Sequence, residues 1–157
     1  MKIRLLTRLL MGSLIIAAAS AAWADDSSML NRKDLKWGDA PPALPKGAKL
    51  TVLYGDPFKP GPYALRAMFP PGYVVPPHFH TKDENLTVLS GALHLGMGEK
   101  IDKKGAHVLN LHGFHHLVGG THHYAFVTTA TVLEIHGDGP FDINYINPAD
   151  DPQTKKK

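Results

Sequence analysis

Apolar and polar residues alternate over short runs along positions 49–146, and glycine, proline or aspartate separates the runs. Side chains two apart on a β-strand share a face, so this period of two predicts strands. The expected strands lie at 50–54, 63–69, 86–89, 92–97, 107–111, 114–118, 124–128, 131–136 and 141–146. No run of about 12 or more residues beyond position 24 has helix spacing. Short strands at such regular spacing, with no repeated motif, predict one all-β sandwich or barrel.

The first 24 residues have the order of a secretory signal peptide. Lys2, Arg4 and Arg8 precede an apolar run from Leu9 to Ala19, and Ala22-Trp23-Ala24 forms an A-x-A cleavage site. The apolar run is shorter than the roughly 20 residues that a membrane-spanning helix needs. We therefore expect cleavage after Ala24, a periplasmic or secreted protein, and no membrane anchor after cleavage.

The rest of the chain divides by composition into three parts. Residues 25–46 are polar and proline-containing, and we expect a mobile or loosely docked N-terminal arm. Residues 47–148 hold the expected strands and form the barrel, and the polar residues 149–157 form a C-terminal tail. A chain of 157 residues suits this single domain.

Charge and cysteine content exclude several classes of protein. The whole chain has 17 Lys and Arg against 14 Asp and Glu, but three of the basic residues lie in the signal peptide. The mature chain is therefore close to neutral, and it lacks the basic patch that a nucleic-acid partner requires. The sequence has no cysteine, which excludes disulfides, iron–sulfur clusters and a cysteine nucleophile. It has 10 histidines, which need an explanation.

The most informative stretch runs from Gly72 to Gly91 and holds His78, His80 and Glu84. The two histidines are two apart, so they share one face of a strand, and Glu84 follows across a short turn. Two imidazoles and a carboxylate suit a divalent first-row metal ion.

The stretch has the form G-x5-H-x-H-x3-E-x6-G, which resembles the first motif of the cupin superfamily at every defining position. This resemblance implies a single cupin jelly-roll β-barrel and a metal held by His78, His80, Glu84 and a third histidine from a second motif. Three further segments are similar to a branch of small exported bacterial cupins, so that the resemblance covers roughly residues 50–152. These segments are Leu93–Gly98, Ile135–Phe141 and Tyr145–Pro152.

Two registers compete for the second motif, G-x5-P-x-G-x2-H-x3-N. One places its histidine at His123, after Gly120, and the other places it at His116, after Gly113. Both registers lack the proline and the terminal asparagine. We prefer His123 because it leads straight into the strand expected at 124–128 and leaves a longer segment between the motifs.

Other polar residues are weaker candidates. His136 shares a face with Glu134 near the end of a strand and could shuttle protons, or be a surface histidine. Arg66 lies within an apolar strand, where it could meet a substrate carboxylate or form a salt bridge on the outside, which we favour. The remaining histidines of this region either add soft-metal ligands or form a polar rim at the barrel mouth, as we prefer. They are His112, His115, His116 and His122.

The resemblance implies a metalloenzyme acting on a small oxygen-bearing molecule, with dioxygenase chemistry first and decarboxylase, lyase or isomerase chemistry next. We favour Fe(II), with Mn, Ni or Zn possible, because the ligand types do not decide between them. An interior lined by Leu86, Val88, Ala125 and Val127 would favour a small aromatic or carboxylic substrate. The alternative is a non-catalytic periplasmic binder of metal or a small molecule, and a purely structural barrel is a third. Sheet edges that need cover make a homodimer plausible.

Overall fold

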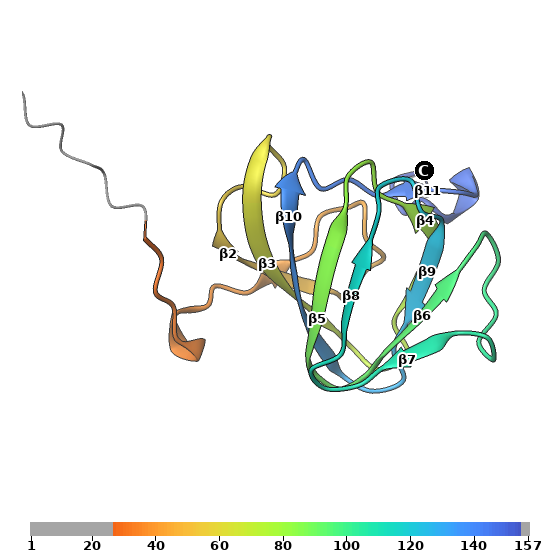
Figure 1. Ribbon diagram of the computed structural model, residues 1–157, viewed down its shortest axis with the longest axis horizontal. Coiled ribbons are helices and arrows are strands. Elements are labelled where there is room, and N and C mark those ends of the chain that lie inside the picture. Colours follow the sequence, from red (N-terminus) through yellow and green to blue (C-terminus); the bar gives the residue numbers. More distant parts are fainter. Residues whose placement is uncertain (1–26, 155–157) are drawn as a thin grey trace, which may run out of the picture.

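Two antiparallel sheets face each other in the computed structural model of the protein, which describes residues 27–154 (Figure 1). The expected signal peptide lies outside the described residues. The first sheet has the order β1 (Gly38–Asp39), β2 (Lys49–Tyr54), β3 (Gly61–Phe69), β10 (Thr131–Gly139), β5 (Glu84–Ser90) and β8 (Phe114–Leu117). The second has the order β11 (Asn144–Tyr145), β4 (Val74–Phe79), β9 (His123–Phe126), β6 (Leu93–Met97) and β7 (His107–Leu109). The expectation of an all-β fold is confirmed.

The helical content of the described chain is two single turns of 3-10 helix, η1 (Arg32–Asp34) and η2 (Pro148–Asp150). Within residues 27–154, no helix has the length and apolar character to cross a membrane.

The core fills the space between the two sheets because the inward positions of the central strands are apolar. On β3 and β10, Leu65, Ala67, Leu133 and Ile135 are all at most 5% exposed. The alternating positions between them carry polar side chains on the outer face. The period-two pattern of the sequence is therefore the pattern of burial in the sheet.

Strand β4 contains a β-bulge, which determines which way its histidine points. Val75 pairs with Ala125 and His78 pairs with His123, so three steps on β4 face two steps on β9. The extra residue lies at Pro76-Pro77, where neither residue has an N–H to donate to a ladder. The bulge reverses the alternation, so both Val75 and His78 are buried and line the interior.

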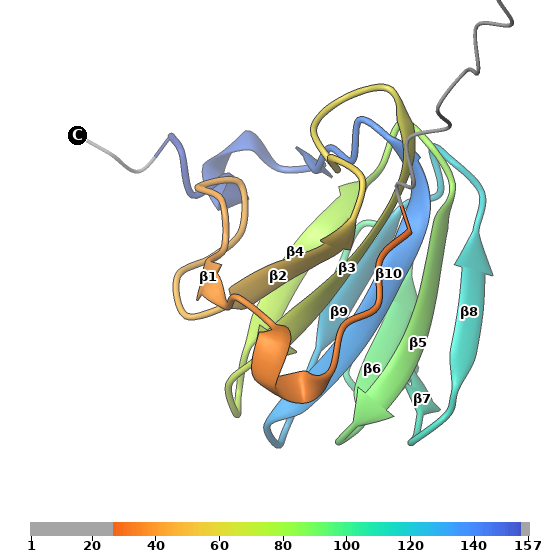
Figure 2. The ribbon, with the colours of Figure 1, turned by 90° about the vertical axis from the view of Figure 1, so that its left-hand side faces the viewer.

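The end of the expected N-terminal arm is docked on the barrel. β1 pairs with β2, and the Tyr73 and Tyr145 hydroxyls donate to the carbonyl oxygens of Pro45 and Ala43 at 2.6 and 2.7 Å. Leu44 packs against the core. Residues 27–37 lie outside the first sheet in Figure 2, where the Ser28 hydroxyl donates to the Leu53 carbonyl at 3.1 Å. The hydroxyls of two tyrosines far away in sequence, together with the packing of Leu44 itself, hold residues 38–46 in place, which the composition of this segment does not reveal.

Candidate metal centre

Three histidines meet at one end of the space between the sheets. His78 on β4 lies opposite His123 on β9, and His80 follows β4 directly. Each offers one ring nitrogen, and these atoms all lie within 4.8 Å of one another. The three residues are between 2% and 5% exposed. The structure thus brings together the three histidines that we expected to share a site.

Backbone carbonyls determine which nitrogen of each ring is free. The Nδ1 atoms of His78, His80 and His123 lie 2.7, 2.5 and 2.9 Å from carbonyl oxygens of Pro76, Asp142 and Thr121. A carbonyl can only accept, so each Nδ1 carries the proton and donates it. Each Nε2 then keeps its lone pair, which is the tautomer that a metal ligand requires.

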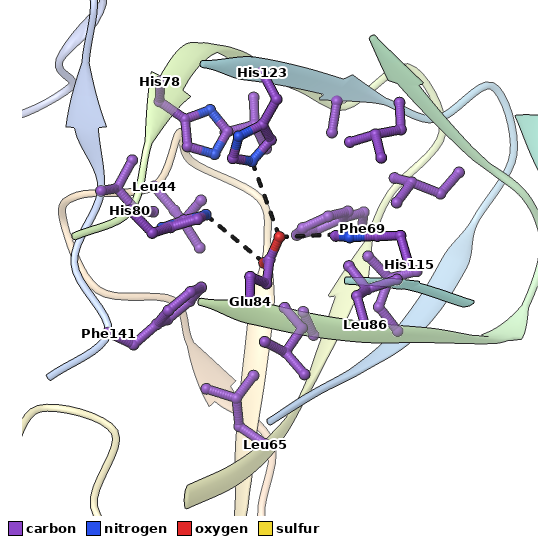
Figure 3. A pocket seen from close by; sticks show the side chains of 18 of the residues that line it. Leu44, Leu65, Phe69, His78, His80, Glu84, Leu86, His115, His123 and Phe141 are labelled. Carbon is purple, nitrogen blue, oxygen red and sulfur yellow. Dashed lines mark ion pairs between the residues drawn. The ribbon is translucent and has the colours of Figure 1, made fainter. Parts of the chain in front are cut away.

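Glu84 stands at the start of β5 and completes the cluster from the opposite sheet. Its Oε1 lies 3.7 Å from His80 Nε2, and its Oε2 lies 3.9 Å from His123 Nε2 (Figure 3). The residue is 6% exposed. The carboxylate therefore faces the nitrogens that the backbone leaves free.

Burial controls the charge of this group. It lowers the pKa of His78 well below the usual range, and the neighbouring His123 and His80 lower that pKa further. It also lowers the pKa values of His80 and His123. The same burial raises the pKa of Glu84 to about 7, against an opposing influence of His123. The imidazoles are therefore neutral at neutral pH, and a carboxylate beside them lacks a compensating cation.

The donor set fits a divalent metal ion. Three neutral imidazoles and one carboxylate are ligands that first-row metals accept, and a bound cation would offset the burial of the Glu84 charge. No lysine or arginine lines the cavity anywhere in residues 27–154, so no side chain competes for that role. His78, His80, Glu84 and His123 would hold the ion.

The cluster opens into a small apolar cavity, shown in Figure 3. The volume that the centre of a water molecule can occupy inside this cavity is about 50 Å³. One water needs roughly 10–15 Å³ on this measure, so the cavity accepts only a small molecule or part of one. Leu86 and Ala125 line it as expected, whereas Val88 and Val127 lie in the closed core. Phe69, Phe141 and Leu44 complete the apolar wall near the polar cluster.

Arg66 and His136 do not reach this cavity. Arg66 donates from Nε and pairs through Nη2 with Glu134 Oε2, both at 3.0 Å, on the outer face of the first sheet. His136 is exposed on the same strand as Glu134. The reason is the alternation along β3 and β10, which turns Leu65 and Ile135 inward and these residues outward. The external salt bridge that we favoured for Arg66 is present. A contact of Arg66 with substrate, or proton transfer by His136 in the cavity, does not agree with the positions of these two residues outside the cavity.

His116, the competing candidate for the second motif, also lies outside. Its Nδ1 is 3.0 Å from Asn85 Oδ1, and its side chain is 47% exposed. His122 pairs with Glu99 at 3.0 Å on the surface, and His112 is exposed in a turn. His116 and His122 are placed as a polar rim would be, whereas the His112 amide donates to the Val88 carbonyl, toward the end of β5 that lies away from Glu84.

His115 was expected on the polar rim, and for this residue the expectation is wrong. Its side chain is 9% exposed, it lines the cavity, and its Nε2 lies 3.6 Å from Glu84 Oε2. A signal for this was present in the sequence. On the strand expected at 114–118, His115 shares a face with the apolar Leu117, which is buried.

No protein-family model and no curated protein matches this sequence. Solved structures do match it. A candidate acetylacetone dioxygenase from Methylibium petroleiphilum aligns at a TM-score of 0.61 and 15% identity, over 91% of this chain and 90% of that chain. The polyketide cyclase RemF from Streptomyces resistomycificus aligns at 0.60 and 17% identity, over 80% and 89% of the two chains.

An RmlC-like cupin from Shewanella frigidimarina aligns at a TM-score of 0.54 and 17% identity, over 69% of this chain and 87% of that chain. A cupin-2 domain protein from Rhodospirillum rubrum aligns at 0.57. The protein therefore has the cupin fold, as the resemblance in its sequence implies. At these identities the likeness concerns the fold.

Proposed function

We propose that this protein is a metal-dependent enzyme that acts on a small oxygen-bearing molecule. The observation that carries the proposal is the buried cluster of His78, His80 and His123, whose free nitrogens lie within 4.8 Å of one another beside Glu84. A divalent ion bound there would supply Lewis-acid polarisation of a carbonyl or redox chemistry with dioxygen. Four protein ligands leave one or two coordination positions for substrate.

The chain's own residues bind, orient and shield the substrate. The apolar wall excludes bulk water from the polar cluster, which strengthens electrostatic interactions inside it. The size of the cavity restricts the substrate to a compact molecule or a compact reacting group. Because no lysine or arginine lines the cavity in the described chain, the charge of a substrate carboxylate or enolate would be compensated mainly by a bound metal ion.

Dioxygenase-like chemistry is our first choice of reaction, and decarboxylase, lyase or isomerase chemistry comes next. The fold neighbours that support an enzyme include a candidate dioxygenase and a polyketide cyclase, which act in different reaction classes. Fe(II) is the first metal to test, followed by Mn, Ni and Zn, since imidazole and carboxylate accept all of them.

We also propose that the mature protein acts in the periplasm or outside the cell. The support is the sequence of residues 1–24, with its basic start, apolar run and A-x-A site. Fractionation and N-terminal sequencing of the exported protein test this directly. A mature chain that begins at Asp25 supports the proposal, and a cytoplasmic chain that retains Met1 contradicts it.

The decisive experiment is elemental mass spectrometry on the mature protein, with His123→Ala, Glu84→Ala and His116→Ala as variants. We expect about one first-row metal per chain in the wild type. The first two variants lose the metal because they remove a buried donor. His116→Ala keeps it because that side chain lies outside the cavity.

An oxygen-uptake screen with small carbonyl and carboxylic compounds follows on the loaded protein. Metal-dependent consumption of oxygen supports the dioxygenase, and turnover without oxygen supports the other reaction classes. Stoichiometric metal without turnover favours the non-catalytic binder. A wild type without stoichiometric metal contradicts the metalloenzyme and the metal binder, and it favours a binder of a small molecule or a structural barrel.

A further inference from the structure

His115 lines the cavity but has no part in the function proposed so far. It lies on β8, an edge strand of the first sheet, where it pairs with Leu86 of β5. Its neighbours along the strand, Phe114 and His116, are exposed, whereas His115 and Leu117 point inward. β8 thus sends a single polar side chain into an otherwise apolar part of the cavity.

Both ring nitrogens of His115 are buried and have no hydrogen-bond partner. A polar group buried without a partner costs free energy, so the ring needs a compensating contact in the functional state. Oε2 of Glu84 lies 3.6 Å from Nε2 of His115, and Figure 3 shows the ring directed at that carboxylate. A movement of a few tenths of an ångström brings the two atoms to hydrogen-bonding distance.

The proton of His115 is free to be on the nitrogen that faces Glu84. His78, His80 and His123 each have Nδ1 bonded to a backbone carbonyl, which leaves Nε2 as an acceptor. His115 has no such carbonyl, so nothing holds its proton on Nδ1. Its Nε2 can carry the proton and donate to a carboxylate, which a ligand imidazole cannot do from its metal-facing nitrogen.

We infer that His115 is a positioning residue: its Nε2–H donates to Oε2 of Glu84 and holds Oε1 toward the three-histidine cluster. The inference rests on the proposed function, because it assigns to Glu84 the role of a metal ligand. A carboxylate held by a second hydrogen bond loses less freedom when it binds a metal, and such outer contacts commonly contribute 10–100-fold to metal affinity. The three histidines whose ligand atoms lie within 4.8 Å of one another are His78, His80 and His123, so His115 is not part of that histidine cluster.

The test compares metal affinity in three variants of the mature protein. His115→Phe keeps a flat ring but removes the donor, and His115→Gln keeps a donor. His116→Phe makes the same change one residue along the strand, on the outer face. Zn(II) affinity is measured by competition with a chromophoric chelator, and Cu(II) electron paramagnetic resonance reports the nitrogen donors.

We expect His115→Phe to weaken Zn(II) binding about 10–100-fold with an unchanged set of nitrogen couplings. His115→Gln recovers most of the affinity, and His116→Phe binds as the wild type does. His115→Leu takes the place of the phenylalanine variant if circular dichroism shows that the latter does not fold.

Three results would overturn the inference. Wild-type affinity in the apolar variants means that Glu84 needs no second contact. Loss of one nitrogen coupling means that His115 is itself a ligand. Failure of the glutamine variant to recover affinity reduces the role of His115 to packing. A wild type that binds no metal overturns the proposed function as well, whereas these three results leave the metal site standing.

Discussion

At the scale of the single residue, the burial of Glu84 suits a bound metal ion but lowers the stability of the metal-free protein when the carboxylate is ionised. Burial raises the pKa of its carboxyl to about 7, above the usual value of 4.5. In the metal-free fold the proton is therefore bound more tightly than in the unfolded chain. The contribution of Glu84 to the stability of the metal-free protein therefore falls as the pH rises from 4.5 through 7, because the folded state must then hold a buried charge.

Replacing Glu84 with glutamine removes that charge and keeps the shape of the side chain. We expect Glu84→Gln to raise the free energy of unfolding of the metal-free protein by about 2 kcal/mol at pH 8. At pH 5 the two proteins differ little, because Glu84 is protonated in the fold. Urea unfolding in the presence of a chelator measures both values. The same variant loses the stabilisation by added Zn(II).

Glu134→Gln is the matched control for this prediction. Glu134 pairs with Arg66 on the outer face and its side chain is 32% exposed. Removing such a partly solvated charge costs roughly 0–1 kcal/mol, so this variant gains no stability at pH 8. A stability gain in Glu134→Gln, or none in Glu84→Gln, contradicts the account of the buried carboxylate.

At the scale of the element, strand β9 carries the third histidine, and its far face is fixed by Tyr124. This residue is 2% exposed, and its ring lies over Gly96 of the neighbouring β6. The Tyr124 hydroxyl donates to the Asp102 carbonyl at 2.7 Å and accepts from the Asp102 amide at 2.9 Å. The segment that connects β6 and β7 is thereby fastened to the strand that positions His123.

Gly96→Ala tests this arrangement because the added Cβ would overlap the phenol ring of Tyr124. The Tyr124 ring must then move out of its buried position, and its hydroxyl loses the hydrogen bonds to Asp102. We expect a loss of about 1–3 kcal/mol of stability, the usual cost of overpacking. The midpoint of thermal unfolding measures it. Gly38→Ala, whose new Cβ would meet nothing within 4 Å, has an unchanged midpoint.

The strands also show which structural features the sequence pattern predicts and which it does not. The alternation predicted nearly every strand of the two sheets, and the spacing of His78 and His80 predicted that they share a face. It did not predict the bulge at Pro76-Pro77, which decides that this face is the interior. Without the bulge, regular alternation from the buried Val75 would point Phe79 inward and His78 outward. The extra residue reverses the faces of the strand after it, so that His78 points inward instead.

Strand pairing accounts for the other differences. An arginine within an apolar strand could have faced either side, and only the register of β3 with β10 places Arg66 beside Glu134. In the same way, His115 became a site residue only when β8 paired with β5 and brought it near Glu84. Contacts between residues far apart in sequence depend on register, which a single sequence specifies only weakly on a polar edge strand.

At the scale of the whole molecule, the buried titratable groups make the stability of the metal-free protein depend on pH. Burial lowers the pKa values of His78, His80, His115 and His123, that of His115 to about 4. Below their usual pKa of 6.5 the unfolded chain binds protons that the fold does not. Stability from these groups is therefore present above pH 6.5 and is lost as the pH falls. Glu84 acts in the opposite direction, but it is one group against four.

We therefore expect the chelator-treated protein to be less stable at pH 5 than at pH 7, with His115 alone contributing about 1–2 kcal/mol of the difference. Urea unfolding at a series of pH values measures the slope. In His115→Phe the pH dependence of the unfolding free energy is smaller by about one proton, because phenylalanine does not titrate. His136→Ala leaves it unchanged, because that histidine is exposed on the outer face. A stability that is constant or rises between pH 6.5 and pH 5 would mean that the cluster admits protons and water in the metal-free fold. Its nitrogens would then not be held neutral and ready for a metal by burial.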